Sequence, residues 1–520
     1  MPEMSPHPDA HTTIVRGALI IDGTGSAGYI GDVAFSDGVI TAVGHVDRSP
    51  TAAIVDADGL VVAPGFVDIH SHSDLSILGH PQGTSKVLQG VTTEVVGNCG
   101  LAVAPVSSLD VAALMRPGMT YCEDTRVAWD WTSVAEYRQR VKEANPALSV
   151  EILAGHNVIR GSVIGLDERD ATPAELEQMC DMLDQALTEG ALGMSLGLMY
   201  PPSSYASEDE LITLGRVLAG HDAMLASHMA NYSEGLLESV ASMIRVGEAS
   251  GCRVQISHLT ATGRPNWGSA VAALDLIDAA IARGVDVAAD FYPYLAGSTN
   301  LSQVVPGWAM SGGLPALRGR LDDSETRQRI RAHLDGKAWE EFLIVSFPPE
   351  PGLEGQRLPD AAAQRGIEPT DLALQLLAVG DPTIIAFGRS EEDLLAVIAH
   401  HATVLGSDGL AVETNGTVGG SVPHPRFFGA FPALFEKYVR EERVLSLEHA
   451  VYKCTAGPAE RVRLRDRGRI APGLRADLVL FDPDAIADSS TYEDSRQVPR
   501  GIHRVFRQGR EIARDGLVLW

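Results

Sequence analysis

The chain has few cysteines, no long apolar run and no segment with the features of a secretory signal. Its 520 residues hold five cysteines, Cys99, Cys122, Cys180, Cys252 and Cys454. Because they show no paired spacing, no disulfide framework is predicted. No apolar stretch approaches the ~18 residues that a membrane span needs, and the start, MPEMSPHPDAHTT, lacks a basic segment followed by an apolar one. These absences predict a cytoplasmic protein with no membrane partner.

Positive charge is also scarce. Lys and Arg total 41 against 68 Asp and Glu, which gives a net charge of −27. A surface this acidic does not hold a polyanion, so a nucleic-acid partner is excluded. Hydrophobic residues make up 45% and charged residues 21%, which is typical of a globular chain long enough for one large domain and a smaller one. The number of subunits stays open, a homo-oligomer included.

Both ends of the chain have the pattern of short strands. Residues 13–63 contain apolar runs separated by turn signals, with a hairpin pattern around Asp37-Gly38. Residues 464–520 show the same pattern of short apolar runs and turns. We therefore predict a small β-sandwich domain formed by both ends, after a disordered segment over residues 1–12. The alternative is two separate β extensions.

The middle, residues 64–463, alternates apolar strands with helices. The predicted strands are 66–70, 91–97, 149–155, 192–196, 223–228, 253–258, 285–291 and 402–408. Helical segments include 235–249 and one that begins at a capping box, Thr172-Pro173-Ala174-Glu175, and carries Cys180 on its apolar face. Eight such units favour an α/β fold of the (β/α)₈ TIM-barrel type, because the doubly wound alternative lacks a glycine-rich dinucleotide turn. A long excursion at about 293–400 predicts an inserted lid or subdomain.

Polar residues stand where the predicted strands end. They are His70, His72, Cys99, His156, Tyr200, His228, His258 and Asp408. In a barrel of this type the carboxyl ends of the strands gather at one face and form the active site. The H-x-H pair at the first strand puts both imidazoles on one side, and a thiolate ligand at Cys99 favours zinc over harder cations.

Ordered motifs give the chain a specific resemblance. APGFVDIHSHSD, GVTTEVVGNCG, LGMSLGLMYPPSSYAS, SHMANYSEG, VQISHL, DFYPYLAGST, GSDG and PHPRFFGAFP follow one another, with PGLRADLVLFDP near the end. From about residue 13 onward the chain resembles the N-acyl-D-amino-acid deacylase (D-aminoacylase) branch of the amidohydrolase superfamily. The resemblance implies a tight zinc site at Cys99, His228 and His258. It also implies a second site, often weak or empty, lined by His70, His72 and Asp408.

The resemblance further implies that Asp408 takes a proton from a zinc-activated water and passes it to the leaving amine. The products would be a carboxylic acid and an amine. Gly-Ser-Asp-Gly is also a turn-like string, so a helix-capping role for Asp408 is the alternative.

The substrate contacts match the family only in part. Tyr200, Ser298 and Arg426 occupy positions that grip a substrate carboxylate, and His156 is also expected at the substrate. A lysine of the family is replaced by Thr260, so one positive charge is missing, and Arg264 is a candidate to supply it.

Three hypotheses follow. The first is deacylation of N-acyl-D-amino acids, and the second is hydrolysis of a neutral, substituted or cyclic amide without a free carboxylate, which Thr260 favours. The third is an inactive barrel used as a binding scaffold. Acyl and side-chain specificity are not readable from the sequence.

Overall fold

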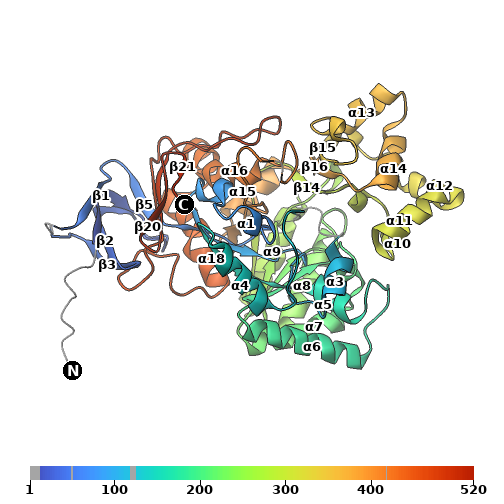
Figure 1. The fold of residues 1–520 in the computed structure, drawn as a ribbon, viewed down its shortest axis with the longest axis horizontal. Coiled ribbons are helices and arrows are strands. Elements are labelled where there is room, and N and C mark those ends of the chain that lie inside the picture. Colours follow the sequence, from blue (N-terminus) through green and yellow to red (C-terminus); the bar gives the residue numbers. More distant parts are fainter. Residues whose placement is uncertain (1–11, 48–50, 117–123, 417) are drawn as a thin grey trace.

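The computed structural model describes residues 12–47, 51–116, 124–416 and 418–520. Residues 1–11 of the segment predicted to be disordered, and Cys122, lie outside the described residues. Figure 1 shows three parts: strands from both chain ends on one side, a central body of strands and helices, and a yellow-to-orange insertion on the other side.

The central body is a closed barrel. In chain order, the described strands of the barrel are β6 (Phe66–Asp68), β7 (Val91–Val96), β8 (Ser149–Ile152) continued by β9 (Ala154–Gly155), β10 (Gly193–Gly197), β11 (Met224–His228), β12 (Arg253–Ile256), β13 (Val287–Phe291) and β17 (Thr403–Leu405). Neighbours pair in parallel. Between β8 and β9 the Leu153 N–H donates to the Val96 carbonyl at 2.9 Å.

The first and last strands close the ring. A parallel bridge joins Ser71 to Gly409, and the Asp408 N–H donates to the His70 carbonyl at 2.8 Å. The predicted barrel is therefore confirmed, and the open doubly wound sheet is excluded. Its strands are mostly buried apolar runs, as expected where helices cover a parallel sheet.

Helices surround the barrel. They include α1 (Ser76–Gly79), α2 (Thr84–Val87), α3 (Leu109–Met115), α4 (Val134–Ala144), α5 (His156–Val163), α6 (Pro173–Thr188), the 3₁₀ turn η2 (Ser203–Tyr205), α7 (Glu208–Gly220), α8 (Leu236–Ser250), α9 (Ser269–Ala282), α15 (Glu391–Ala399), α16 (Arg426–Ala433), α17 (Leu447–Cys454) and α18 (Ala456–Arg461). The predicted capping box starts α6: Thr172 accepts a hydrogen bond from the Glu175 N–H, and Glu175 accepts one from the Thr172 N–H. Cys180 packs partly buried against the core, as predicted.

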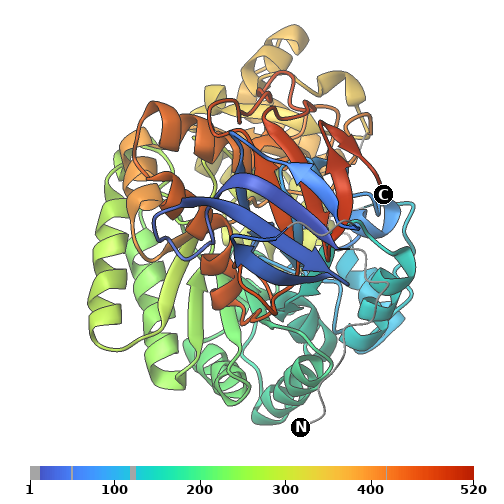
Figure 2. The ribbon, with the colours of Figure 1, turned by 90° about the vertical axis from the view of Figure 1, so that its left-hand side faces the viewer.

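Strands from both ends form one sheet, which faces the viewer in Figure 2. Within the described residues its strands are β1 (Thr13–Ile20), β2 (Tyr29–Ser36), β3 (Val39–Gly44), β4 (Ala53–Asp56), β5 (Val61–Pro64), β18 (Leu478–Phe481), β19 (Ile502–Arg507), β20 (Arg510–Arg514) and β21 (Leu517–Val518). The antiparallel pairing of β5 with β18 joins the two ends, so they are not separate extensions. The Asp37-Gly38 turn has φ of 50° and 80°, which suits the predicted hairpin.

The insertion has a core of its own. Strands β14 (Gly297–Asn300), β16 (Thr383–Ala386) and β15 (Phe342–Ser346) form an antiparallel sheet, accompanied by α10 (Gly307–Met310), α11 (Gly313–Asp322), α12 (Ser324–Leu334), α13 (Leu358–Arg365) and α14 (Pro369–Val379). The separate core runs from Leu301 to Ile384 and includes Leu372. Helix α15, at the end of the predicted segment 293–400, packs instead on α9 of the barrel.

None of the described helices combines the length and the apolar character that crossing a bilayer requires.

Candidate active site

The predicted metal ligands meet at one end of the barrel. His70 and His72 follow β6, Cys99 follows β7, His228 ends β11, His258 follows β12 and Asp408 follows β17. Their ligand atoms form two groups that share Cys99, one with His70, His72 and Asp408 and one with His228 and His258. Within each group the atoms lie within 4.8 Å of one another. Both groups are buried, so the fold brings all six predicted ligands together.

Short distances define the shared centre. The Cys99 sulfur lies 3.3 Å from His70 Nε2 and 3.5 Å from His258 Nε2. Asp408 Oδ1 lies 2.9 Å from His72 Nε2 and 3.5 Å from His70 Nε2. Cys99 therefore stands between the two groups, with Asp408 on the side of the H-x-H pair.

Three of these residues have left-handed backbone conformations. The φ angles are 55° at Cys99, 35° at His258 and 52° at Asp408. Residues with a Cβ rarely adopt this region, and where they do, the strain often marks a functional site. Here the conformations turn the chain directly after three different strands, and each turn aims a ligand side chain at the common centre.

The donor set fits zinc. His228 is buried, and neither of its ring nitrogens has a hydrogen-bond partner in the described part of the chain. Burial lowers the pKa of His228 to about 3, so the imidazole is neutral, which is the form that binds a metal. Burial also raises the pKa of the Cys99 thiol to about 11, so cation binding has to drive loss of its proton. Two imidazoles and a thiolate are typical zinc ligands.

Asp290, on β13, was missed by the sequence reasoning. Its Oδ1 lies 3.1 Å from His70 Nδ1 and accepts the backbone N–H of His258 at 2.7 Å. A carboxylate on Nδ1 fixes the tautomer that leaves Nε2 for a metal. The only signal in the sequence was an acid near the end of the strand-like run VDVAADF, which also holds Asp286.

Arg426 contacts Asp408 rather than standing apart from the centre. The two side chains are buried, and Arg426 Nη1 lies 2.9 Å from Asp408 Oδ2. Burial acts to raise the pKa of Asp408, but Arg426 and His72 outweigh it, so the pKa lies well below its ordinary value. Asp408 is therefore a carboxylate at neutral pH.

Comparison with known proteins agrees with this geometry. A model of the amidohydrolase family matches residues 53–513. The chain belongs to the amidohydrolase family. This amidohydrolase is 33% identical to a D-aminoacylase of Alcaligenes xylosoxydans xylosoxydans, over 96% of this chain and 94% of that one. It is 35% identical to an N-acyl-D-glutamate deacylase of the same organism, over 95% and 92%.

A solved structure is similar over the same length. The N-acyl-D-glutamate deacylase of Bordetella bronchiseptica, complexed with zinc and a phosphonate inhibitor, is 33% identical to this amidohydrolase. The two superpose with a TM-score of 0.83, covering 97% of this chain and 98% of that one.

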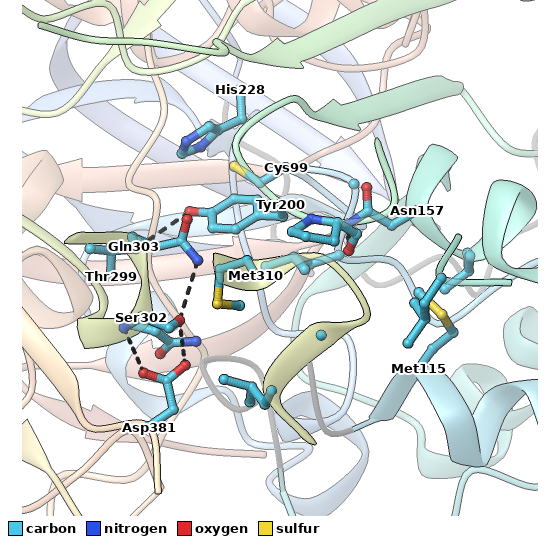
Figure 3. Close-up of a pocket in the computed structure, with 18 of the residues that line it drawn as sticks. Cys99, Met115, Asn157, Tyr200, His228, Thr299, Ser302, Gln303, Met310 and Asp381 are labelled. Carbon is cyan, nitrogen blue, oxygen red and sulfur yellow. Dashed lines mark hydrogen bonds between the residues drawn. The ribbon is translucent and has the colours of Figure 1, made fainter. Parts of the chain in front are cut away.

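A cavity of about 290 Å³ opens beside the ligands of this amidohydrolase. Figure 3 shows Cys99 and His228 at one end of it and Ser302 and Asp381 at the other. Large apolar residues from the barrel and the insertion line it, among them Leu101, Leu114, Met115, Val158, Leu166, Met310 and Leu314. The insertion thus forms one wall of the site.

The predicted substrate residues lie in different places. Tyr200 and Ser298 line this cavity. His156 does not: it is fully buried, with Nδ1 2.6 Å from Ser203 Oγ and Nε2 2.9 Å from Glu210. Thr260 lines a smaller neighbouring cavity. Arg264 is exposed on the surface, with its guanidinium 5.4 Å from the ring centroid of Trp267.

Proposed function

We propose that this amidohydrolase hydrolyses the amide bond of N-acyl-D-amino acids with zinc held by Cys99, His228 and His258. The observation that supports this is the convergence of six buried ligands from five strand ends beside one cavity. The D configuration is inferred from the relatives, whose names specify D-amino acids. His70, His72 and Asp408 would hold a second ion.

Asp408 is the proposed proton acceptor. Zinc, when bound, would supply Lewis acidity that activates water and polarises the amide carbonyl. Asp408 Oδ1 faces the ligand centre, whereas Oδ2 pairs with Arg426. Because the carboxylate is ionised at neutral pH, Oδ1 is able to take a proton and later give it to the leaving amine.

Arg426, Ser298 and Tyr200 are proposed to bind the substrate carboxylate. Arg426 uses Nη1 for Asp408, and a guanidinium has five N–H donors, so it has the capacity to serve a second acceptor. It would then connect the carboxylate of the substrate with the proton acceptor.

The substrate side chain that occupies the cavity is proposed to be neutral and apolar. Among the described residues, no Lys or Arg lines the cavity, whereas two acids, Asp381 and Asp408, do line it. An acidic side chain placed there would lose hydration and gain no counter-charge. This favours a neutral substrate over the D-glutamate derivative named for one relative.

A cytoplasmic location is also proposed. The four described cysteines, Cys99, Cys180, Cys252 and Cys454, are free thiols, which suits a reducing compartment.

The test combines metal analysis with a substrate panel. The purified protein should hold about one tightly bound zinc, and Cys99→Ala should lose it together with activity. Cys252→Ala is the matched control, because Cys252 is equally buried but lies outside both ligand groups. N-acetyl-D-methionine should be hydrolysed faster than N-acetyl-D-glutamate and than N-acetyl-L-methionine.

Three results would contradict the proposal. Full activity in a metal-free preparation would exclude the zinc site. A preference for neutral amides over every N-acyl-D-amino acid would favour the second hypothesis, and complete inactivity with zinc bound would favour the scaffold.

A further inference from the structure

Tyr232 lies against the two histidines of the proposed tight zinc site. It is buried in the loop between β11 and α8, and its ring centroid lies 5.0 Å from that of His228 and 5.1 Å from that of His258. The hydroxyl of Tyr232 accepts the Met229 N–H at 2.9 Å and donates to the Ser257 carbonyl at 3.1 Å. One side chain therefore contacts both imidazoles and bonds to the backbone beside each of them.

The sheet alone does not fix how these two histidines face each other. The ladder between β11 and β12 ends at the pair Ser227–Ile256, followed by a hydrogen bond from the Ser257 N–H to the Ser227 carbonyl at 2.9 Å. Both His228 and His258 lie beyond the last of these bonds. The phenol hydroxyl thus bridges the two strand ends at the point where the ladder stops.

The peptide group between Ser257 and His258 is held on both sides. Its carbonyl accepts from the Tyr232 hydroxyl, and its N–H donates to Asp290 Oδ1 at 2.7 Å. This peptide precedes the left-handed φ of 35° at His258, a conformation that persists only where the surroundings enforce it. Tyr232 and Asp290 together enforce the turn that brings the imidazole to Cys99.

The direction of the His228 ring depends on aromatic packing. A metal-binding imidazole usually has its second nitrogen fixed by a hydrogen bond, as Asp290 fixes Nδ1 of His70. Within the part of the chain that the structure describes, neither buried nitrogen of His228 has such a partner. Its imidazole instead packs against the rings of Tyr200 and Tyr232, at centroid distances of 4.8 Å and 5.0 Å.

The backbone of Tyr232 is fastened as well. Its carbonyl accepts hydrogen bonds from the Thr262 N–H at 2.8 Å and from the Thr262 hydroxyl at 3.2 Å. The loop after β11 is thus joined to the loop after β12 through the main chain and through the phenol. A side chain held at both ends is able to position the groups that it contacts.

We propose that Tyr232 is a positioning residue that sets the geometry of His228 and His258 for zinc. This rests on the proposed zinc site and extends it, because the Tyr232 hydroxyl is committed to the backbone and is not offered as a ligand. The hydroxyl fixes the spacing of the two strand ends, and the ring fixes the direction of the imidazoles. Because the ligands are set before the ion arrives, binding needs less reorganisation and zinc is held more tightly.

The experiment measures zinc affinity by competition with a chromophoric chelator. Tyr232→Phe keeps the ring and removes the hydroxyl, whereas Tyr232→Leu also removes the aromatic contacts with both imidazoles. We expect the zinc dissociation constant to rise about tenfold in Tyr232→Phe and about 100-fold in Tyr232→Leu, the range expected when groups that orient metal ligands are removed. At zinc concentrations that fill the site, Tyr232→Phe should regain most of its kcat/KM for N-acetyl-D-methionine.

Tyr137→Phe is the matched control. Tyr137 is also buried, and its hydroxyl donates to the Asp74 carbonyl at 2.9 Å, but its ring packs on Trp131. Both Phe variants should lose stability to urea, because each leaves a buried carbonyl without its donor. Only Tyr232→Phe should lose zinc affinity.

The outcomes separate this role from the proposed function. An unchanged zinc dissociation constant in Tyr232→Phe, or an equal rise in Tyr137→Phe, would overturn the positioning role. Absence of zinc binding by the unmodified protein would overturn the zinc site itself. Inactivity of the zinc-loaded unmodified protein on N-acyl-D-amino acids would contradict the proposed function alone, because zinc affinity measures the role of Tyr232 independently of the substrate.

Discussion

Asp408 has partners of two kinds. Its Oδ1 faces the imidazoles of His72 and His70, and its Oδ2 faces the guanidinium of Arg426. The residue also has a left-handed backbone, directly after the last barrel strand. A turn residue alone would need neither the burial nor these partners, so the structure favours the catalytic role over the capping role.

Replacing Asp408 with Asn keeps the shape and removes the proton acceptor. We expect kcat to fall at least ~10²-fold, the usual contribution of acid–base catalysis. Zinc content should stay near that of the unmodified protein, because the group of Cys99, His228 and His258 does not include Asp408. Steady-state kinetics and elemental analysis on one preparation measure both.

Asp381→Asn serves as the control for this change. Asp381 lines the same cavity and accepts hydrogen bonds from Ser302, but it belongs to neither ligand group. Its substitution should therefore leave kcat within a few-fold, on the scale of a neutral hydrogen bond. Near-normal kcat in Asp408→Asn would mean that Asp408 is a turn residue after all.

The convergence of the proposed ligands was predictable from the sequence for a physical reason. Parallel strands of a barrel deliver their carboxyl ends to one face, so polar residues that end apolar runs must meet there. Asp290 also lies near the carboxyl end of a predicted strand, 285–291, but it was not singled out. Its side chain contacts His70, which follows another strand, and this contact is visible only in the folded chain.

At the scale of elements, His156 joins three of them. It begins α5, contacts Ser203 in η2, and contacts Glu210 in α7, which also accepts from Arg160. Burial acts to raise the pKa of Glu210, but His156 and Arg160 lower it below its ordinary value. Glu210 is therefore an ionised carboxylate that links these elements. The contacts of His156 with Ser203 and Glu210 support the segment that carries Tyr200 into the cavity.

His156→Phe should destabilise the fold rather than weaken substrate binding directly. Glu210 would lose one of its partners while it stays buried, which costs about 1–3 kcal/mol. Urea unfolding measures the loss. His221→Phe is the control, because His221 pairs with Asp184 near the surface, where ion pairs contribute about 0–1 kcal/mol. Unchanged stability with a raised KM would instead place His156 in contact with the substrate, as the sequence predicted.

The strands were predicted almost to their ends, whereas the insertion was predicted only as an excursion. Barrel strands such as β11 and β13 are buried along their whole length, and strands alternate with helices along most of the barrel. The strands of the insertion pair antiparallel and out of chain order, β14 with β16 and β16 with β15. Nothing in their spacing specifies that order, because it depends on which faces the helices α11 and α14 cover.

At the scale of the whole molecule, two hydrophobic cores meet at the active site. One core fills the space between barrel and helices and includes Leu225 on β11, the strand that ends in His228. The other fills the insertion and includes Leu372 on α14. The proposed metal ligands all belong to the barrel side, whereas Ser298 and Asp381 reach the cavity from the insertion side.

This division predicts different consequences for the same chemical change in the two cores. Leu225→Ala and Leu372→Ala each delete a fully buried side chain and should each cost about 2–5 kcal/mol in the core concerned. Leu225→Ala should lower both global stability and zinc content, because it loosens the strand that carries a ligand. Leu372→Ala should speed hydrogen exchange in the insertion alone and lower activity, since the cavity loses one wall, while zinc stays bound. Hydrogen exchange, metal analysis and kcat/KM on the two variants measure these effects. Loss of zinc in Leu372→Ala would show that the insertion and the barrel unfold as one unit.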